Sequence, residues 1–209
     1  MEQLKTGTTT VGIVCKDGIV LAADKRATAG NLIAQKKAQK IHEVTDKMAV
    51  TIAGSVADIQ LLIKLIRAEL RLKEIREGKP SSVKSAATLL AGMVYQNIRK
   101  MSMIPGISHF LFGGVDAKGL ELYDIFPDGS IAEVEDFIAS GSGSVFAFGV
   151  LETLYKPGMS VDEGADLALK AITAALARDS ASGNGVDLWK ITKNGVEKIS
   201  TKIAETSLV

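Results

Sequence analysis

Three consecutive threonines near the start of the chain could supply a nucleophile. Residues 7–12 read Gly-Thr-Thr-Thr-Val-Gly, and such β-branched residues are typical of a β-strand. The ordinary interpretation is an edge strand with alternating polar side chains. The alternative is a cleavage point. If the Gly7–Thr8 bond is cut, Thr8 carries both a hydroxyl and a free α-amine, which titrates near pH ~8 and can serve as its base.

A threonine hydroxyl is a weak nucleophile and needs a positive field close to it. Lys40 is a candidate for that field because an ammonium group stabilises a developing alkoxide, although most lysines are simply solvated. Asp24 could pair with Lys40 and keep it charged. Its ordinary alternative is a surface carboxylate at the end of a strand.

Gly54 joins an apolar strand to a helix expected to begin at Ser55. Backbone N–H groups at such a junction bind negative charge, and a glycine lets a substrate approach closely. The N–H group of Gly54 could therefore donate to an oxyanion. The same residues are also typical of a tight strand-to-helix turn without any catalytic role.

Two segments rich in serine and glycine lie later in the chain. Residues 141–144, Gly-Ser-Gly-Ser, lack both GxGxxG and the GK[ST] ending, which excludes a nucleotide site. Residues 179–183, Asp-Ser-Ala-Ser-Gly, offer a carboxylate and hydroxyls that could hold an amine, or they form a solvated loop. His42 and His109 have no second ligand at metal spacing. We expect structural roles for both, with no metal and no cofactor.

Composition narrows the class of protein. The 209 residues are 46% hydrophobic with a mean hydropathy of +0.20, which suggests buried subunit interfaces as well as a core. The net charge of +1 shows no basic excess for nucleic acid or an anionic membrane. No apolar run reaches the ~18 residues of a membrane span. With one cysteine, Cys15, and no signal peptide in residues 1–7, we expect a cytoplasmic protein.

Hydrophobic periodicity predicts one domain in the order strands, two helices, strands, two helices, strands. Two helix layers enclosing two packed sheets would satisfy this order. The expected helices are 55–76, 82–100, 145–154 and 160–178. The expected strands are 8–15, 19–24, 40–44, 48–53, 107–115, 120–126, 131–134, 137–139, 186–192 and 196–199, and residues 30–34 are expected to form a turn and a short strand.

The first two strands are expected to form a hairpin with a two-residue turn at Asp17-Gly18. Counting back from that turn sets Ala27 opposite Thr8. Strict alternation would place Asp24 on the other face of the sheet from Thr8. A bulge or a longer turn would reverse that arrangement, and the sequence leaves both possibilities open.

Taken together, these segments resemble the proteasome β subunits, and most closely the archaeal type. The resemblance covers nearly the whole chain after Gly7 and rests on motifs in the family's order and spacing. These motifs are Gly-Thr-Thr-Thr-Val-Gly at 7–12, Ala-Asp-Lys-Arg at 23–26, Lys40, Ala-Gly at 53–54, Gly-Ser-Gly-Ser at 141–144 and Arg-Asp-Ser-Ala-Ser-Gly at 178–183.

The resemblance implies an α+β fold, the four-layer αββα sandwich of the N-terminal nucleophile hydrolases. It also implies a propeptide, residues 1–7, cleaved at Gly7–Thr8 from a single catalytic domain, residues 8–209. Thr8 is then the nucleophile of a threonine endopeptidase. The supporting roles implied are Lys40 and Asp24 for tuning the hydroxyl, Ser142, Asp179 and Ser182 for ordering the amine and a water, and Gly54 for the oxyanion.

By the same resemblance, the primary specificity pocket is lined by Ala27, Thr28, Ala38, Ile52 and Val56. Its apolar character predicts chymotrypsin-like cleavage of unfolded proteins. The implied assembly is four stacked seven-membered rings, with α subunits in the outer rings and β subunits in the inner ones, reached by a regulatory ATPase through the α rings.

Two alternatives stay open. The chain could be an unprocessed structural subunit that supports an active paralogue, since possession of the motifs does not require cleavage. It could also be an N-terminal nucleophile amidohydrolase that acts on small molecules, although the segments 141–144 and 179–183 favour the proteasome branch.

Overall fold

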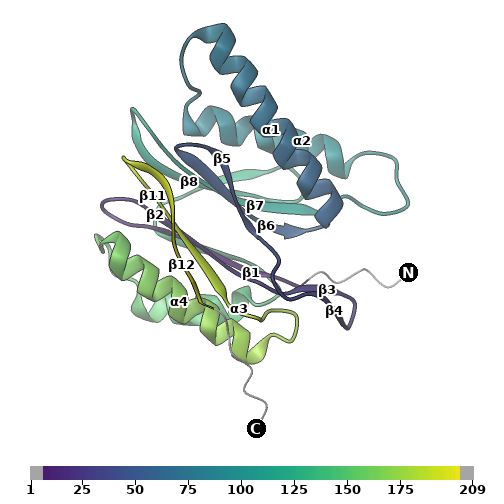
Figure 1. Cartoon of the computed structure of the whole chain (residues 1–209), viewed down its shortest axis with the longest axis vertical. Helices are drawn as coiled ribbons and strands as arrows, with labels where there is room; N and C mark the ends of the chain where they lie inside the picture. The colour runs from purple at the N-terminus through teal and green to yellow at the C-terminus, as the bar shows by residue number, and fades with distance from the viewer. Residues whose placement is uncertain (1–6, 203–209) are drawn as a thin grey trace.

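The computed structural model describes residues 7–202 and has four layers, with two β-sheets packed face to face between two pairs of helices (Figure 1). The expected αββα sandwich is confirmed. One sheet has the order β10–β1–β2–β11–β12, where the strands are β1 (Thr9–Val14), β2 (Ile19–Asp24), β10 (Phe137–Gly141), β11 (Val186–Thr192) and β12 (Gly195–Lys202).

The second sheet has the order β5–β6–β7–β8–β9, and a small hairpin stands apart from both sheets. All strand pairs in the structure are antiparallel. The strands of the second sheet are β5 (Ile41–Thr45), β6 (Met48–Gly54), β7 (Ser108–Asp116), β8 (Gly119–Ile125) and β9 (Ile131–Val134), and those of the hairpin are β3 (Ala27–Ala29) and β4 (Leu32–Gln35).

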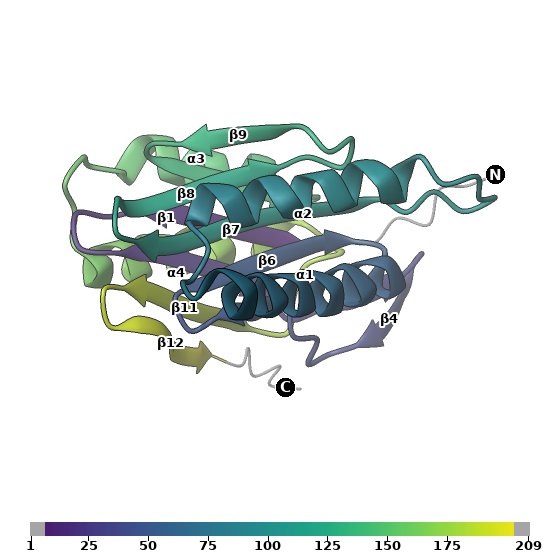
Figure 2. The same ribbon diagram turned by 90° about the horizontal axis from the view of Figure 1, so that it is seen from above.

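The helices form the outer layers. Helices α1 (Val56–Glu77) and α2 (Val83–Ile98) cover the second sheet, while α3 (Ser144–Leu154) and α4 (Val161–Arg178) cover the first (Figures 1 and 2). Each pair encloses its own apolar core, and a third apolar cluster lies between the sheets. Within residues 7–202, none of the helices is both long and apolar enough to span a bilayer.

Element boundaries agree with the sequence-based expectations to within about two residues, apart from β12, which ends three residues later than expected. The expected turn and short strand within 30–34 correspond to the turn at Gly30-Asn31 and to β4, whereas β3 was not expected. The buried residues of α1 recur at helical spacing and are Ile59, Leu62, Ile63, Ile66 and Leu70.

The expected register of the first hairpin is wrong by two residues. Thr10 pairs with Ala23, and the Cys15 N–H group donates to the Gly18 carbonyl, so the turn lies at Lys16-Asp17. A Cβ atom on Gly18 would lie 2.6 Å from the Ile191 carbonyl oxygen. This glycine is therefore packed against β11 rather than placed at the apex of the turn.

Ala27 consequently does not lie opposite Thr8, and it begins β3 instead. The β1–β2 ladder runs without a bulge, so strict alternation holds. Asp24 still reaches the site because, as the last residue of β2, its carboxylate accepts from the Thr9 N–H group and from Lys40.

The residues that precede α1 and α4 differ in their capping. Ser55 precedes α1 but makes no capping bond; its hydroxyl donates to the Asp58 carboxylate at 2.6 Å. Ser160 and Glu163 form a capping box at α4. Hydrogen bonds from the Ser160 backbone and hydroxyl lower the pKa of Glu163.

A lowered pKa in the folded state means that Glu163 contributes stability above its unfolded pKa of about 4.3, and that this contribution is lost as the pH falls through the folded pKa. We predict that Glu163→Gln lowers the denaturation midpoint at pH 7 and that the difference from wild type shrinks below pH ~4. Chemical denaturation at both pH values tests this. Glu152→Gln, on an exposed site of α3, is the control, and an equal difference at both pH values would contradict the prediction.

Candidate active site

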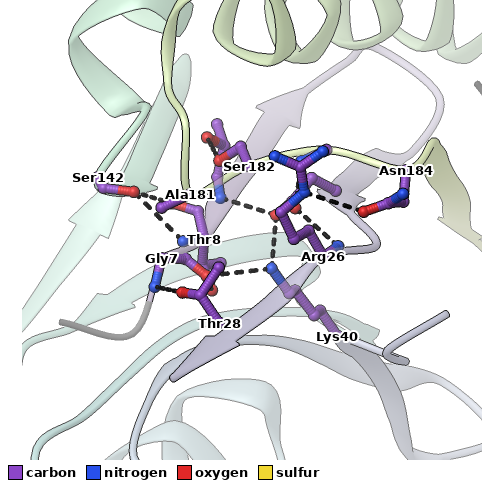
Figure 3. A network of polar contacts seen from close by, with 12 residues as sticks. Gly7, Thr8, Arg26, Thr28, Lys40, Ser142, Ala181, Ser182 and Asn184 are labelled. Carbon is purple, nitrogen blue, oxygen red and sulfur yellow. Dashed lines mark hydrogen bonds and ion pairs between the residues drawn. The ribbon is translucent and has the colours of Figure 1, made fainter. Parts of the chain in front are cut away.

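The carboxylate of Asp24 is buried at the end of β2 and accepts four hydrogen bonds. Three come from the backbone N–H groups of Thr9, Arg26 and Gly183, at 2.9 to 3.0 Å. The fourth is an ion pair with the Lys40 ammonium group, whose Nζ lies 2.6 Å from Oδ1. These contacts tie together four stretches of chain that are distant in sequence (Figure 3).

Lys40 is itself buried, with 5% of its side chain exposed, just before β5. Burial lowers its pKa, because desolvation disfavours the charged ammonium, and the neighbouring Asp24 carboxylate opposes that effect. The expected pairing of these two residues is therefore present. The Lys40 ammonium also donates to the carbonyl oxygen of Gly7 at 3.4 Å.

The Thr8 side chain lies beside the peptide bond that joins Thr8 to Gly7. The Thr8 hydroxyl donates to the Gly7 carbonyl oxygen at 2.6 Å. That oxygen thus receives two hydrogen bonds, one from Thr8 and one from Lys40. The Lys40 ammonium group withdraws electron density from the carbonyl carbon and favours nucleophilic attack there, whereas the Thr8 hydroxyl would have to leave its own bond to the oxygen before it could attack.

The backbone N–H group of Thr8 faces the segments 141–144 and 179–183. It donates to the Ser142 hydroxyl at 3.3 Å, and Ser142 in turn donates to Asp179 Oδ2 at 2.6 Å. Ser182 donates to the same carboxylate oxygen at 2.6 Å. The structure therefore brings Ser142, Asp179 and Ser182 together around the nitrogen atom that cleavage would convert to an amine.

Two glycines allow these segments to approach Thr8. Gly141, at the end of β10, has a φ of +93°, and a Cβ atom there would lie 2.0 Å from the Thr8 carbonyl oxygen. A Cβ atom on Gly7 would lie 1.8 Å from that of Ala181. The chain therefore has no room for a side chain at either place without moving the backbone.

Arg26 is a site residue to which the sequence interpretation assigned no role. Its guanidinium group donates to the Ser180 carbonyl at 2.8 Å and to the Asn184 side chain at 2.9 Å. It thereby holds two points of the loop that carries Asp179 and Ser182, and Figure 3 shows its contact with Asn184. The motif at 23–26 was a signal for this residue, but its partners lie more than 150 residues away.

The threonine after Thr8 was also missed as part of the network. Its hydroxyl lies 2.7 Å from that of Ser182, so Thr9 contacts the serine that shares Asp179 with Ser142. Alternation directs this side chain away from the second sheet. No sequence signal distinguishes it from its two neighbours.

Gly54 is not joined to Thr8 or Gly7 by any hydrogen bond among the described residues. Its φ is +129°, and a Cβ atom would lie 2.2 Å from the Ile107 carbonyl oxygen. The packing of β6 against β7 therefore accounts for a glycine at this position, whatever its N–H group contributes to chemistry.

The expected pocket residues come from four different elements. Thr28, on β3, accepts a hydrogen bond from the Gly7 N–H group at 3.1 Å. Ala38 and Ile52 are buried, and the Ile52 N–H group donates to the Lys40 carbonyl, which joins β6 to the segment before β5. Ala27 is half-buried, and Val56, at the start of α1, is 52% exposed.

His42 and His109 lie on different strands, and within residues 7–202 no three His, Cys, Asp or Glu side chains are grouped to hold a metal ion. Burial and the nearby Arg67 lower the pKa of His42. Residues 1–6 of the expected propeptide lie outside the described part of the chain.

Two antiparallel sheets packed between helix pairs, with a threonine at the start of β1, define the sandwich of the N-terminal nucleophile hydrolases. Comparison with known proteins identifies the family more closely. The family described as "Proteasome subunit" matches residues 4–191. The chain therefore belongs to the proteasome subunit family.

Similar proteins named "Proteasome subunit beta" occur in archaea. The one from Archaeoglobus fulgidus is 44% identical over 207 residues, which is 99% of this chain and 95% of the relative. Those from Archaeoglobus profundus and Methanocaldococcus vulcanius are 47% and 45% identical, over 95% and 96% of this chain and 91% and 88% of the relatives. The similarity supports the archaeal β-subunit type, and family membership implies assembly into a multisubunit proteasome core.

Proposed function

We propose that this chain is a catalytic β subunit of the proteasome core particle, a threonine endopeptidase whose mature form begins at Thr8. The observation that carries the proposal is the Thr8 hydroxyl beside the Gly7 carbonyl, which also accepts from the buried Lys40 ammonium group. Nucleophile, scissile carbonyl and positive charge lie together in one intact chain. This is the arrangement that self-cleavage requires.

In maturation, the Thr8 oxygen attacks the carbonyl carbon of Gly7. The C–N bond breaks as the nitrogen takes a proton, which leaves Gly7 joined to Thr8 by an ester. Water then hydrolyses the ester, releasing the Gly7 carboxylate and restoring the Thr8 hydroxyl. The products are a propeptide of residues 1–7 and a catalytic domain of residues 8–209 with a free α-amine.

In the mature enzyme, that amine accepts the hydroxyl proton through a water as Thr8 attacks a substrate carbonyl. Ser142, Asp179 and Ser182 order the amine and the water, and their hydrogen bonds to one another and to the Thr8 nitrogen support this role. Lys40, held by Asp24, stabilises the Thr8 alkoxide, and the Gly54 N–H group donates a hydrogen bond to the oxyanion.

The proposed setting is a chamber of four stacked seven-membered rings in the cytoplasm, with α subunits outside. Unfolded proteins enter through the α rings with the help of a regulatory ATPase. The second candidate is an unprocessed structural subunit. The full set of polar contacts around Thr8 favours an active subunit over this alternative.

Thr8 is tested first. We predict that Thr8→Ala retains residues 1–7 and has no peptidase activity, whereas Thr8→Ser, which keeps a hydroxyl, is cleaved. Intact mass and peptide hydrolysis of the assembled particle measure both. Thr10→Val is the control in the same strand, because the Thr10 hydroxyl has no hydrogen-bond partner in the described structure. Normal turnover by Thr8→Ala would refute the assignment, and a wild type that keeps residues 1–7 would support the structural subunit.

Lys40 is tested by kcat. Loss of one electrostatic contact to a transition state costs on the order of 3 kcal/mol, so Lys40→Ala should lower kcat about a hundredfold in particles that still assemble. Lys25→Ala is the matched control, because Lys25 is also buried but pairs with Asp187 at 3.3 Å. If assembled Lys40→Ala particles kept a near-normal kcat, its role would be structural.

The specificity of the pocket follows from its lack of charge. Ala27, Ala38, Ile52 and Val56 offer no counter-charge to a basic or acidic side chain, and burying an unpaired charge is costly. His42, on the adjoining β5, has a pKa lowered by burial and by Arg67, so it adds little positive charge at neutral pH. An apolar side chain instead gains roughly 25 cal/mol per Å² buried.

We therefore predict broad cleavage after Leu, Tyr or Phe in preference to Arg or Glu, measured with a fluorogenic peptide panel on the assembled particle. Hydrophobic pockets discriminate weakly, by about 1–3 kcal/mol per methylene, so no single residue should dominate. Ile52→Glu should shift the preference toward basic residues. Equal or faster cleavage after Arg by the wild type would show that the pocket is assigned wrongly.

A further inference from the structure

A chain of three polar side chains lies between the two sheets, apart from the contacts already described. His109, on β7, has Nε2 2.5 Å from Asp124 Oδ1 on the neighbouring β8. Its other ring nitrogen, Nδ1, lies 2.7 Å from the hydroxyl oxygen of Ser140 on β10. The three residues therefore connect an edge strand of the first sheet to two strands of the second. We call this set the inter-sheet relay.

Which atom carries the hydrogen in each bond of the inter-sheet relay follows from the donors available. An ionised Asp124 can only accept, so Nε2 of His109 carries the hydrogen that faces it. In a neutral ring Nδ1 is then the acceptor, and the Ser140 hydroxyl donates to it. The aromatic ring of Phe126 stacks on His109 with centroids 5.4 Å apart and fixes the plane of the imidazole.

A serine, a histidine and an aspartate in this order resemble a nucleophilic triad. The place of Ser140 in the fold argues against that role here. Ser140 is fixed in the β10 ladder opposite Thr10, and its side chain lies in the layer between the two sheets. Thr8 is also buried, but it precedes the ladder and lies next to Gly7, the residue that cleavage would remove. The relay therefore acts through the strand that carries it.

That strand leads directly to Thr8. β10 is an edge strand that pairs with β1 alone, and the ladder ends with Ser140 opposite Thr10 and Gly141 opposite Thr9. Ser142 follows at once, and its hydroxyl accepts from the Thr8 N–H group. Because β10 has no second neighbouring strand, its attachment to the opposite sheet at Ser140 limits how far Ser142 can move, in addition to the bond between Ser142 and Asp179.

We propose that Ser140 and His109 are positioning residues, which pin the end of β10 to the second sheet and thereby hold Ser142 against the nitrogen of Thr8. This inference rests on the proposed function. Asp124 fixes the ring of His109, and the ring fixes the strand. Both Asp124 and Ser140 are buried, where hydrogen bonds are strong and an unpaired polar group is costly, so the relay resists displacement.

Loss of the inter-sheet relay should affect catalytic turnover more than substrate binding. The pocket residues are on β3, β6, α1 and the segment before β5, none of which carries a relay residue. Ser142 contacts the nitrogen that acts as the base after cleavage, and small errors in the placement of catalytic groups cost large factors in rate. Loosening β10 should therefore lower kcat and leave KM nearly unchanged.

The test compares Ser140→Ala with Ser140→Thr in the assembled particle. kcat is expressed per Thr8 site, counted by covalent titration, so that a loss of properly assembled sites does not count as slow turnover. We expect Ser140→Ala to lower kcat about tenfold with KM changed less than about twofold, and Ser140→Thr, which keeps the hydroxyl, to recover most of the rate.

Thr51→Val is the matched control. The Thr51 hydroxyl, on β6, is also buried but has no hydrogen-bond partner in the described structure, so its removal should leave kcat near that of wild type. If the Ser140→Ala particle does not assemble, His109→Gln is measured by the same criteria. The inference would be overturned if the variant measured had a kcat per site near that of wild type. It would also be overturned if Ser140→Ala and Thr51→Val lost kcat equally.

The wild-type particle separates this inference from the proposed function. A wild type without Thr8-dependent activity would mean that the proposed function itself has failed. An active wild type with an equally active Ser140→Ala particle would remove only the positioning role of the relay.

Discussion

The buried carboxylate of Asp24 is the constraint on which the rest of the site depends. An ionised carboxylate away from water must be compensated, and here three backbone N–H groups and one ammonium group do so. These donors fix β1 at Thr9, the start of the segment after β2, the loop at Gly183 and the side chain of Lys40. Removing the carboxylate would leave Lys40 buried without its partner, and the positions of all four stretches relative to Thr8 would no longer be set.

The layer between the two sheets changes character along its length. Near the first hairpin it is filled by apolar side chains such as Ile19, Leu21 and Leu122. Toward the start of β1 it contains the polar side chains of Thr10, His109, Asp124 and Ser140, all of which are buried or nearly so. Apolar packing holds the sheets together without fixing individual atoms, whereas hydrogen bonds fix both distance and direction. The polar end of the layer is therefore suited to hold the strands that surround Thr8.

Gly7 occupies the place that a substrate residue would take under the proposed function. The Gly7 N–H group bonds to Thr28 on β3, and the Gly7 carbonyl faces both Lys40 and the Thr8 hydroxyl. The same groups would meet a substrate carbonyl once the propeptide is gone. Under the proposed function, a single set of polar contacts would therefore serve both self-cleavage and turnover.

The sequence by itself determined the order and type of the elements, because apolar periodicity and turn residues are local properties. It also identified Thr8, Asp24, Lys40, Ser142, Asp179 and Ser182 as a set, through spacing shared with a known family. The register of the first hairpin was decided only by the tertiary structure, because Gly18 packs against β11 and is unavailable for the turn. Arg26 and His109 gained their roles in the same way. The partners of His109 are 15 and 31 residues away, on strands that adjoin it only when the two sheets pack, so no local pattern could distinguish it from an isolated histidine.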